Sequence, residues 1–118
     1  MGRQILITSK DQGLKHDSGK PAWGLLPWVE MDFVVKVLTF GAKKYKPGNW
    51  MHVHGGEERY FDACLRHLSA VKRGEWLDRE TKLPHYAHAL CSLLFAFWHG
   101  RRRGHGKANG NSTSKQQG

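Results

Sequence analysis

The chain has 118 residues, of which 39% are hydrophobic and 25% charged, and this length allows one domain but not two separate cores. It contains no apolar run of about 18 residues, so we expect no transmembrane helix, and its polar N-terminus lacks the apolar segment of a secretory signal. The formal net charge of +9 favours anionic partners, which are nucleic acid, phosphorylated small molecules or acidic membranes. We expect no membrane partner, because the sequence offers no second membrane signal besides its basic charge.

Residues 1–26 are predicted to form an extended arm, because they contain several glycines, one proline and no sustained helical period. Within this arm the segment KHDSGKP places Lys15 and Lys20 around the flexible Gly19. Ammonium groups beside a glycine-containing turn can gather around a phosphate together with backbone N–H groups. The phosphate-loop consensus is absent, however, so an ordinary solvated loop explains the same spacing.

The first helix is predicted to open at Pro27, since proline is pre-set for the first helical turn. Apolar residues at helical spacing indicate a buried stripe of Val29, Phe33, Val34, Val37, Leu38 and Phe40, and the sequence KPGN ends it. Lys43 and Lys44 near the helix end are explained by the helix dipole. In a functional interpretation they neutralise phosphate, while Trp50 stacks on a base and Asn49 reads its edge.

The second helix is predicted from Glu57 to Arg73. Its buried face is expected to consist of Tyr60, Phe61, Cys64, Leu65, Leu68 and Val71. The opposite face carries Arg59, Asp62 and Arg66, which are neighbours three and four residues apart. Two interpretations fit this face. It is either a surface ion-pair ladder, or its arginines grip phosphate oxygens while Asp62 orients them or holds a metal.

The third helix is predicted to open at Pro84 and run to Gly100, and it is apolar nearly all round, which is typical of a central, mostly buried element. Its polar members fall in one narrow sector, formed by His85, His88, Ser92 and His99. Such a seam must face partners, water or a ligand, because unpaired polar groups in a core are costly.

Histidines on two predicted helices, with an acid between them, form a candidate metal site. His85 and His88 lie three residues apart on one helix face, and His67 and Asp78 are further candidate ligands. Three imidazoles and one carboxylate suit zinc or another borderline cation. The same histidines are also explained as hydrogen-bonded donors in a helix interface, so metal ligation and the lining of a polar pocket both remain open.

Residues 101–118 are predicted to form a disordered basic tail, because they offer almost no apolar side chain to bury. The tail holds five of the 19 basic residues, so much of the signal for nucleic acid arises there. Residues 27–100 are predicted to be a helical nucleotide-binding domain, and the fold class is all-α, a small bundle of three main helices. Its thin core favours a homo-oligomer. Cys64 and Cys91 fall in apolar patterns and are expected to be reduced core residues of a cytoplasmic protein.

Four segments in order resemble a bacteriophage and prophage domain family of dATP/dGTP diphosphohydrolases, which is related to MazG-like all-α NTP pyrophosphohydrolases. They are KHDSGKP, LTFGAKKYKPGNW, RYFDACLRHLSAVKRGEWLD and LPHYAHALCSLLF, and the resemblance covers residues 15–98. It implies an oligomeric helical bundle that cleaves purine deoxynucleoside triphosphates to a monophosphate and pyrophosphate. If a phage encodes the chain, the resemblance places it in the host cytoplasm.

The resemblance also implies a divalent metal, Mg²⁺ or Mn²⁺, with Zn²⁺ as a further candidate. In the wider superfamily Mg²⁺ is held by a carboxylate pair on one helix and an E-x-x-D motif on the next, whereas this chain has His85-x-x-His88 at the comparable place. Either the metal differs, or carboxylates hold it instead. The candidate metal ligands are therefore Asp62, His67, Asp78, His85 and His88.

For an enzyme of this kind we expect metal-activated water to attack a phosphorus atom. The predicted catalytic residues are Asp62, His67, Asp78 and Glu80. The predicted nucleotide-binding residues are Lys15, Lys20, Lys43, Lys44, Asn49, Trp50, Arg59 and Arg66. Two alternatives stay open, a protein that sequesters a nucleotide without hydrolysing it and a phage protein that binds nucleic acid through its basic tail.

Overall fold

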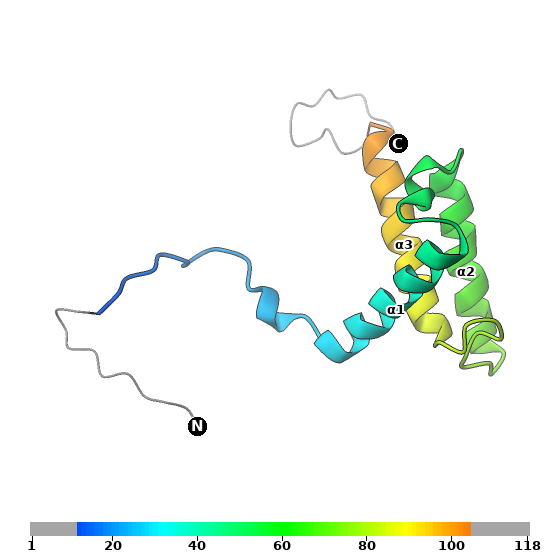
Figure 1. Ribbon diagram of the computed structural model, residues 1–118, viewed down its shortest axis with the longest axis horizontal. Helices are drawn as coiled ribbons and strands as arrows, with labels where there is room; N and C mark the ends of the chain where they lie inside the picture. The colour runs from blue at the N-terminus through cyan, green and yellow to red at the C-terminus, as the bar shows by residue number, and fades with distance from the viewer. Residues whose placement is uncertain (1–11, 105–118) are drawn as a thin grey trace.

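The computed structural model describes residues 12–104, and in these residues every regular element is a helix. The elements in chain order are η2 (Trp23–Leu25), α1 (Trp28–Lys44), η3 (Asn49–His52), α2 (Gly56–Lys72) and α3 (His85–Arg102), where η marks a 3₁₀ helix. The predicted all-α class with three main helices is confirmed. Helices α2 and α3 lie side by side, and α1 packs against α3 (Figure 1).

The described segment before α1 is extended, as predicted, apart from two turns. One is closed by the Lys20 N–H, which donates to the Asp17 carbonyl at 3.1 Å, and the other is the 3₁₀ turn η2. Figure 1 shows the segment leading away from the three α-helices. Residues 1–11 of the predicted arm and 105–118 of the predicted tail lie outside the described part of the chain. Arg101 and Arg102 were assigned to the tail by the sequence prediction, but they belong to the last turn of α3.

The end of α1 sets the position of the following turn. The Tyr45 N–H donates to the Gly41 carbonyl and closes the helix. Gly48 then adopts a left-handed backbone with φ of 77°, which a residue without a Cβ adopts at no steric cost. This reversal brings Asn49 and Trp50 of η3 back toward α3, so that the two residues reach the same cavity as Tyr45.

Helices α2 and α3 run antiparallel, and matched side chains fix their register. The His67 ring stacks on the His88 ring with centroids 4.6 Å apart. Seven residues earlier on α2, Tyr60 meets Phe95, which lies seven residues later on α3, with ring centroids 5.0 Å apart. Seven residues make about two helical turns, so each pair of residues shares one face of its helix.

The packed core is small and lies between α1 and the first half of α3. Its buried members are Val34, Val37, Ala87 and Cys91, with Met31, Phe33, Leu83 and Phe95 packed against them. Small residues, among them three alanines, dominate the buried positions of α3, which lets the neighbouring helices approach closely. Cys64 and Cys91 are both buried and free, as predicted.

The faces predicted to be buried on the three helices are only partly covered, so the prediction is wrong for several residues. Val29 and Leu38 of the predicted α1 stripe are 70% and 36% exposed. Phe61, Leu65 and Leu68 of α2 are 49%, 47% and 36% exposed. Helix α3, predicted to be mostly buried, leaves Leu90, Leu93, Leu94 and Phe97 between 46% and 63% exposed. The reason is that α1 and η3 cover one side of the α2–α3 pair, and no element within residues 12–104 covers the other. None of the described helices is both long and apolar enough to cross a membrane.

Candidate functional site

A cavity of about 490 Å³ lies where the second half of α1, η3, the loop before α3 and the facing sides of α2 and α3 meet. This volume is typical of a site for a small ligand. Its polar lining consists mainly of Lys44, Lys46, His67, Asp78, Glu80, Thr81, His88 and Ser92. Its aromatic lining consists of Phe40, Tyr45, Trp50, Tyr60 and Phe95.

Asp78 shapes the loop that carries the acidic residues of this lining. Its Oδ1 accepts the Glu80 N–H at 2.8 Å and the Thr81 N–H at 3.0 Å, which is the pattern of an Asx turn. The Asp78 N–H donates to the Leu83 carbonyl at 2.8 Å, and Lys82 between them has a left-handed backbone with φ of 62°. The closed loop therefore fixes Asp78 and Thr81 at the wall of the cavity.

Three histidine rings meet at the polar end of the cavity. The His67 Nδ1 lies 2.8 Å from the His85 Nδ1, and the His67 ring stacks on His88 with an interplanar angle of 15°. The His88 Nε2 lies 2.7 Å from the Thr81 hydroxyl oxygen. The predicted convergence of imidazoles from the second and third helices with Asp78 is therefore present.

Burial sets the protonation states at this end. Burial, followed by the nearby His88 and His85, lowers the pKa of His67 to about 4, and burial likewise lowers the pKa of His88. For Asp78, burial raises the pKa, but the N–H groups of Thr81 and Glu80 outweigh it and hold the pKa below its usual value. Neutral imidazoles beside an ionised carboxylate are the forms that ligate metals and accept protons.

A cation from α1 reaches the same cavity. The Lys44 Nζ lies 3.0 Å from the Glu80 Oε2, and the two side chains are 42% and 57% exposed. The hydrogen bond to Glu80 raises the pKa of Lys44, so the ammonium is charged. Exposed ion pairs contribute little to stability, so Lys44 can exchange Glu80 for an anionic ligand at small cost.

The aromatic end is built around Trp50. Its ring stacks on Phe95 with centroids 4.2 Å apart and an interplanar angle of 9°, and Tyr60 meets Phe95 edge-on. The His99 Nε2 donates to the Trp50 carbonyl at 2.9 Å and holds η3 against α3. Phe95 thus occupies one face of the indole that was predicted to stack on a base, and Asn49 beside it also lines the cavity.

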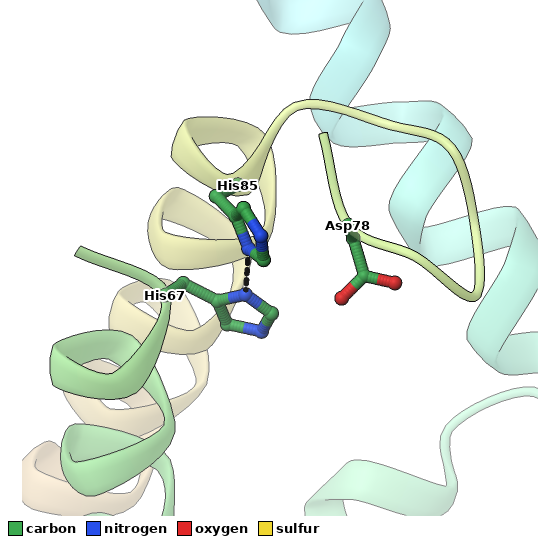
Figure 2. A group of neighbouring side chains, drawn as sticks. All are labelled: His67, Asp78 and His85. Atoms are coloured by element: carbon green, nitrogen blue, oxygen red, sulfur yellow. Dashed lines mark hydrogen bonds between the residues drawn. The ribbon is translucent and has the colours of Figure 1, made fainter. Parts of the chain in front are cut away.

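His67, Asp78 and His85 each offer one ligand atom, and these atoms lie within 4.8 Å of one another. Figure 2 shows the three side chains converging from α2, the loop and the start of α3. Two nitrogens and a carboxylate oxygen fit a divalent metal that accepts imidazole. His88, also predicted as a ligand, lies beside this set and is hydrogen-bonded to Thr81.

Comparison with known proteins assigns the chain to a family. The family model described as "dATP/dGTP diphosphohydrolase, N-terminal" matches residues 10–108. The chain belongs to this family. It is 37% identical over 86 residues to a Salmonella phage PMBT28 protein named dATP/dGTP diphosphohydrolase, a match that covers 73% of the chain. The chain spans only about 29% of that relative's length. No solved structure matches.

In this member of the diphosphohydrolase N-terminal family, three predicted site residues lie away from the cavity. Arg59, Asp62 and Arg66 are exposed on α2 and do not line it. Arg59 instead donates to the His54 carbonyl at 3.2 Å. The physical reason is helical rotation, because the face of α2 that packs against α3 carries Tyr60 and His67.

Of the lysines predicted to bind nucleotide, one lines the cavity and three do not. Lys44 lines the cavity, whereas the neighbouring Lys43 is exposed and does not, since one residue turns a helix by about 100°. Lys15 and Lys20 are exposed on the extended arm and do not line the cavity either. Within residues 12–104, Lys44 and Lys46 are therefore the cations of the lining.

Thr81, Tyr60 and Phe95 line the cavity but were not predicted as site residues. The sequence carried a signal for Thr81, because a threonine three residues after an aspartate is typical of a turn stabilised by the aspartate. Tyr60 and Phe95 lie seven residues from His67 and His88, and this shared spacing would have placed all four side chains on the facing sides of two helices.

Proposed function

We propose that the chain hydrolyses purine deoxynucleoside triphosphates, dGTP or dATP, to the monophosphate and pyrophosphate in this cavity. The observation that carries the proposal is the division of one cavity into an aromatic end and a polar end with a cation beside it. Seven residues of α3 separate Phe95 from His88, a rise of about 10 Å, which suits a base at one end and phosphates at the other. Family membership and the name of the phage relative support the reaction class.

The aromatic end is the proposed base site. Trp50 stacks on Phe95, meets Trp98 edge-on and is held through its carbonyl by the His99 hydrogen bond. A base that contacts the part of Trp50 lining the cavity therefore meets a preformed surface. Asn49 supplies an amide that can donate to and accept from a purine edge. Lys44 and Lys46 would neutralise the phosphates, with Lys44 released from Glu80 as the anion enters.

His88 is the proposed proton acceptor. When its Nε2–H donates to the Thr81 hydroxyl at 2.7 Å, the Nδ1 keeps a lone pair, and the hydroxyl can donate to the Asp78 Oδ1 at 3.4 Å. In the reaction a water oxygen bonds to the α-phosphorus, and the bond from that phosphorus to the oxygen bridging the α and β phosphates breaks. The water proton passes to neutral His88, and pyrophosphate leaves with the bridging oxygen.

A divalent metal fits beside the hydrogen-bonded residues His88, Thr81 and Asp78. His67, Asp78 and His85 would hold it, because their ligand atoms lie close together and two of the side chains also line the cavity. Bound there, a divalent ion would supply Lewis-acid chemistry and neutralise phosphate charge.

We also propose that the chain self-associates through the exposed apolar residues of α2 and α3, because large contiguous apolar surfaces usually mark interfaces. The two free buried cysteines and the phage origin of the relative support the reducing cytoplasm of a host cell as the compartment.

Chromatography of the products tests the proposed reaction. Purified protein incubated with dGTP, dATP and a divalent metal is expected to release the monophosphate and pyrophosphate. Asp78→Asn keeps an oxygen acceptor for the turn but loses the charge, so it should lose at least about 100-fold in turnover with native circular dichroism. Asp32→Asn, exposed on α1, is the matched control and should keep full activity. Stoichiometric retention of intact nucleotide would instead identify a sequestering protein.

A further inference from the structure

The cluster of His67, Asp78 and His85 draws one side chain from each of three elements. His67 lies in the fourth turn of α2, His85 is the first residue of α3, and Asp78 lies in the loop between them. Figure 2 shows the two rings facing each other, with the carboxylate beside them. Because the Asx turn fixes Asp78 and two helices fix the histidines, the donors are preorganised.

His85 provides a second and independent observation. Its side chain is 6% exposed, and its Nε2 is buried without a hydrogen-bond partner in the described residues. The nearest acid, Glu75 Oε1, lies 3.8 Å away, and Glu75 is already paired with Arg79 at 3.0 Å. A buried ring nitrogen without a partner is costly, and metal coordination is a common way in which an imidazole is satisfied.

We infer that His67, Asp78 and His85 form a binding site for an imidazole-preferring divalent ion of the zinc type, and that the site discriminates against Mg²⁺. The inference deepens the proposed function, because His67 and Asp78 also line the cavity, but ion binding stands without turnover. Two histidines and one carboxylate form the set of three protein ligands found in catalytic zinc sites that keep a position open.

The donor set argues against Mg²⁺. This ion prefers oxygen ligands in octahedral geometry, and two of the three donors here are nitrogens. The other acid of the cavity, Glu80, is paired with Lys44, and Asp62 lies on the exposed side of α2. The carboxylate arrangement of the wider superfamily is therefore not reproduced at this cluster.

Calorimetry on the full chain tests the inference without reference to activity. After chelator treatment and dialysis, the protein is titrated with ZnCl₂ or MgCl₂ by isothermal titration calorimetry, and thermal unfolding is followed with each ion. We expect one Zn²⁺ per chain and a higher Tm with Zn²⁺, because an ion bound only by the folded state stabilises it. Mg²⁺ at the same concentration should leave Tm unchanged.

Substitutions of single residues test which side chains bind the ion. His67→Gln and His85→Gln should weaken Zn²⁺ binding at least about tenfold, since even a residue that only supports a ligand costs 10- to 100-fold. His54→Gln, exposed and outside the cluster, is the matched control and should bind as the wild type does. Asp78→Asn keeps an acceptor for the turn, so its weakened binding with native circular dichroism tests the site even if the histidine variants unfold.

Three outcomes overturn the inference: tighter binding of Mg²⁺ than of Zn²⁺, no binding of Zn²⁺, or an equal loss in His54→Gln. The proposed function fails separately. Zinc binding with no cleavage of dGTP would contradict the proposed hydrolase function and support the metal site. Cleavage supported by Mg²⁺ without zinc binding would contradict the metal site and support the hydrolase function.

Discussion

The Thr81 hydroxyl oxygen lies 2.7 Å from the His88 Nε2 and also accepts the Leu83 N–H at 3.2 Å. One side chain therefore connects the loop before α3 to a ring on the first turn of that helix. The link fixes the orientation of the His88 imidazole, on whose face the His67 ring stacks. A ring held in this way presents its other nitrogen in a defined direction, which a proton acceptor requires.

Replacing Thr81 tests whether this orientation matters for turnover. Thr81→Val keeps the shape but loses the hydroxyl, and we expect kcat for dGTP to fall about 10- to 100-fold because His88 loses its orienting partner. Thr81→Ser restores the hydroxyl and should recover most of the rate. The acidic limb of the pH–rate profile should move in the valine variant. Equal kcat values for Thr81→Val and Thr81→Ser would show that the Thr81 hydroxyl does not orient His88 for the reaction.

Lys44 and Lys43 form a matched pair for testing phosphate binding. Lys44→Met should raise KM for dGTP about tenfold, since it removes a charge-assisted contact with a phosphate, and it should weaken the dependence of KM on salt. Lys43→Met changes the net charge equally but lies outside the cavity lining, so KM should stay near the wild-type value. A similar rise in both variants would point to net charge and not to a specific contact.

Stability should depend on pH through His67. Its pKa is about 4 in the folded chain against 6.5 for the free side chain, so between these values the unfolded chain binds a proton that the folded chain does not. Stability is therefore complete above pH 6.5, falls as the pH drops, and loses at most about 3 kcal/mol by pH 4. Urea denaturation in chelator at several pH values measures this. His67→Asn should flatten the slope, and His54→Asn should not.

The sequence predicted much of the fold because the periodic signals are local. Helical spacing of apolar residues placed all three helices within about two residues of their observed ends, and the polar seam of α3 correctly brought His85 and His88 to an interface. The convergence with Asp78 also followed, because Asp78 lies in the loop that connects the two helices carrying His67 and His85.

The rest depended on which helix faces meet, and the pattern of one helix does not encode this. Phe61 and Leu94 are apolar and were expected inside, but within residues 12–104 no element covers them, and they are 49% and 47% exposed. Arg59 and Arg66 have the charge of a phosphate site, yet they lie on the side of α2 turned away from the cavity. In each of these cases the rotation of the helix about its axis, and not the residue type, decided whether the side chain is covered or lines the cavity.

Close packing of the first turn of α2 gives a test of the fold. A Cβ at Gly56 would overlap the His99 ring, which also holds η3 through the Trp50 carbonyl. Gly56→Ala should therefore lower the free energy of unfolding by about 1–3 kcal/mol. Gly41→Ala, in the last turn of α1 with open space around it, should instead raise that free energy by about 0.5–1 kcal/mol. Denaturant titration of both variants gives the comparison, and a neutral Gly56→Ala would contradict the tight packing.

Association of two chains is expected to bury the exposed apolar face of α2 and α3. Leu65, Leu94 and Phe97 are 47%, 47% and 63% exposed. Beside them lies an open groove of about 1450 Å³ between the start of α2 and the end of α3, lined in part by Phe61, Leu93 and Phe97. A two-fold dimer would place this face against its own copy and complete a four-helix core, which the thin core of one chain lacks.

Leu94→Glu places a charge at the centre of this face, and burying that charge without a partner would cost several kcal/mol, so the variant should be monomeric. Val29→Glu makes the same change at a residue that is 70% exposed at the start of α1, and it should keep the wild-type mass. Light scattering after size exclusion at micromolar concentrations measures all three proteins. Unchanged circular dichroism separates dissociation from unfolding in Leu94→Glu. A wild-type chain that is already monomeric, or two variants that behave alike, would show that another surface or partner covers these residues.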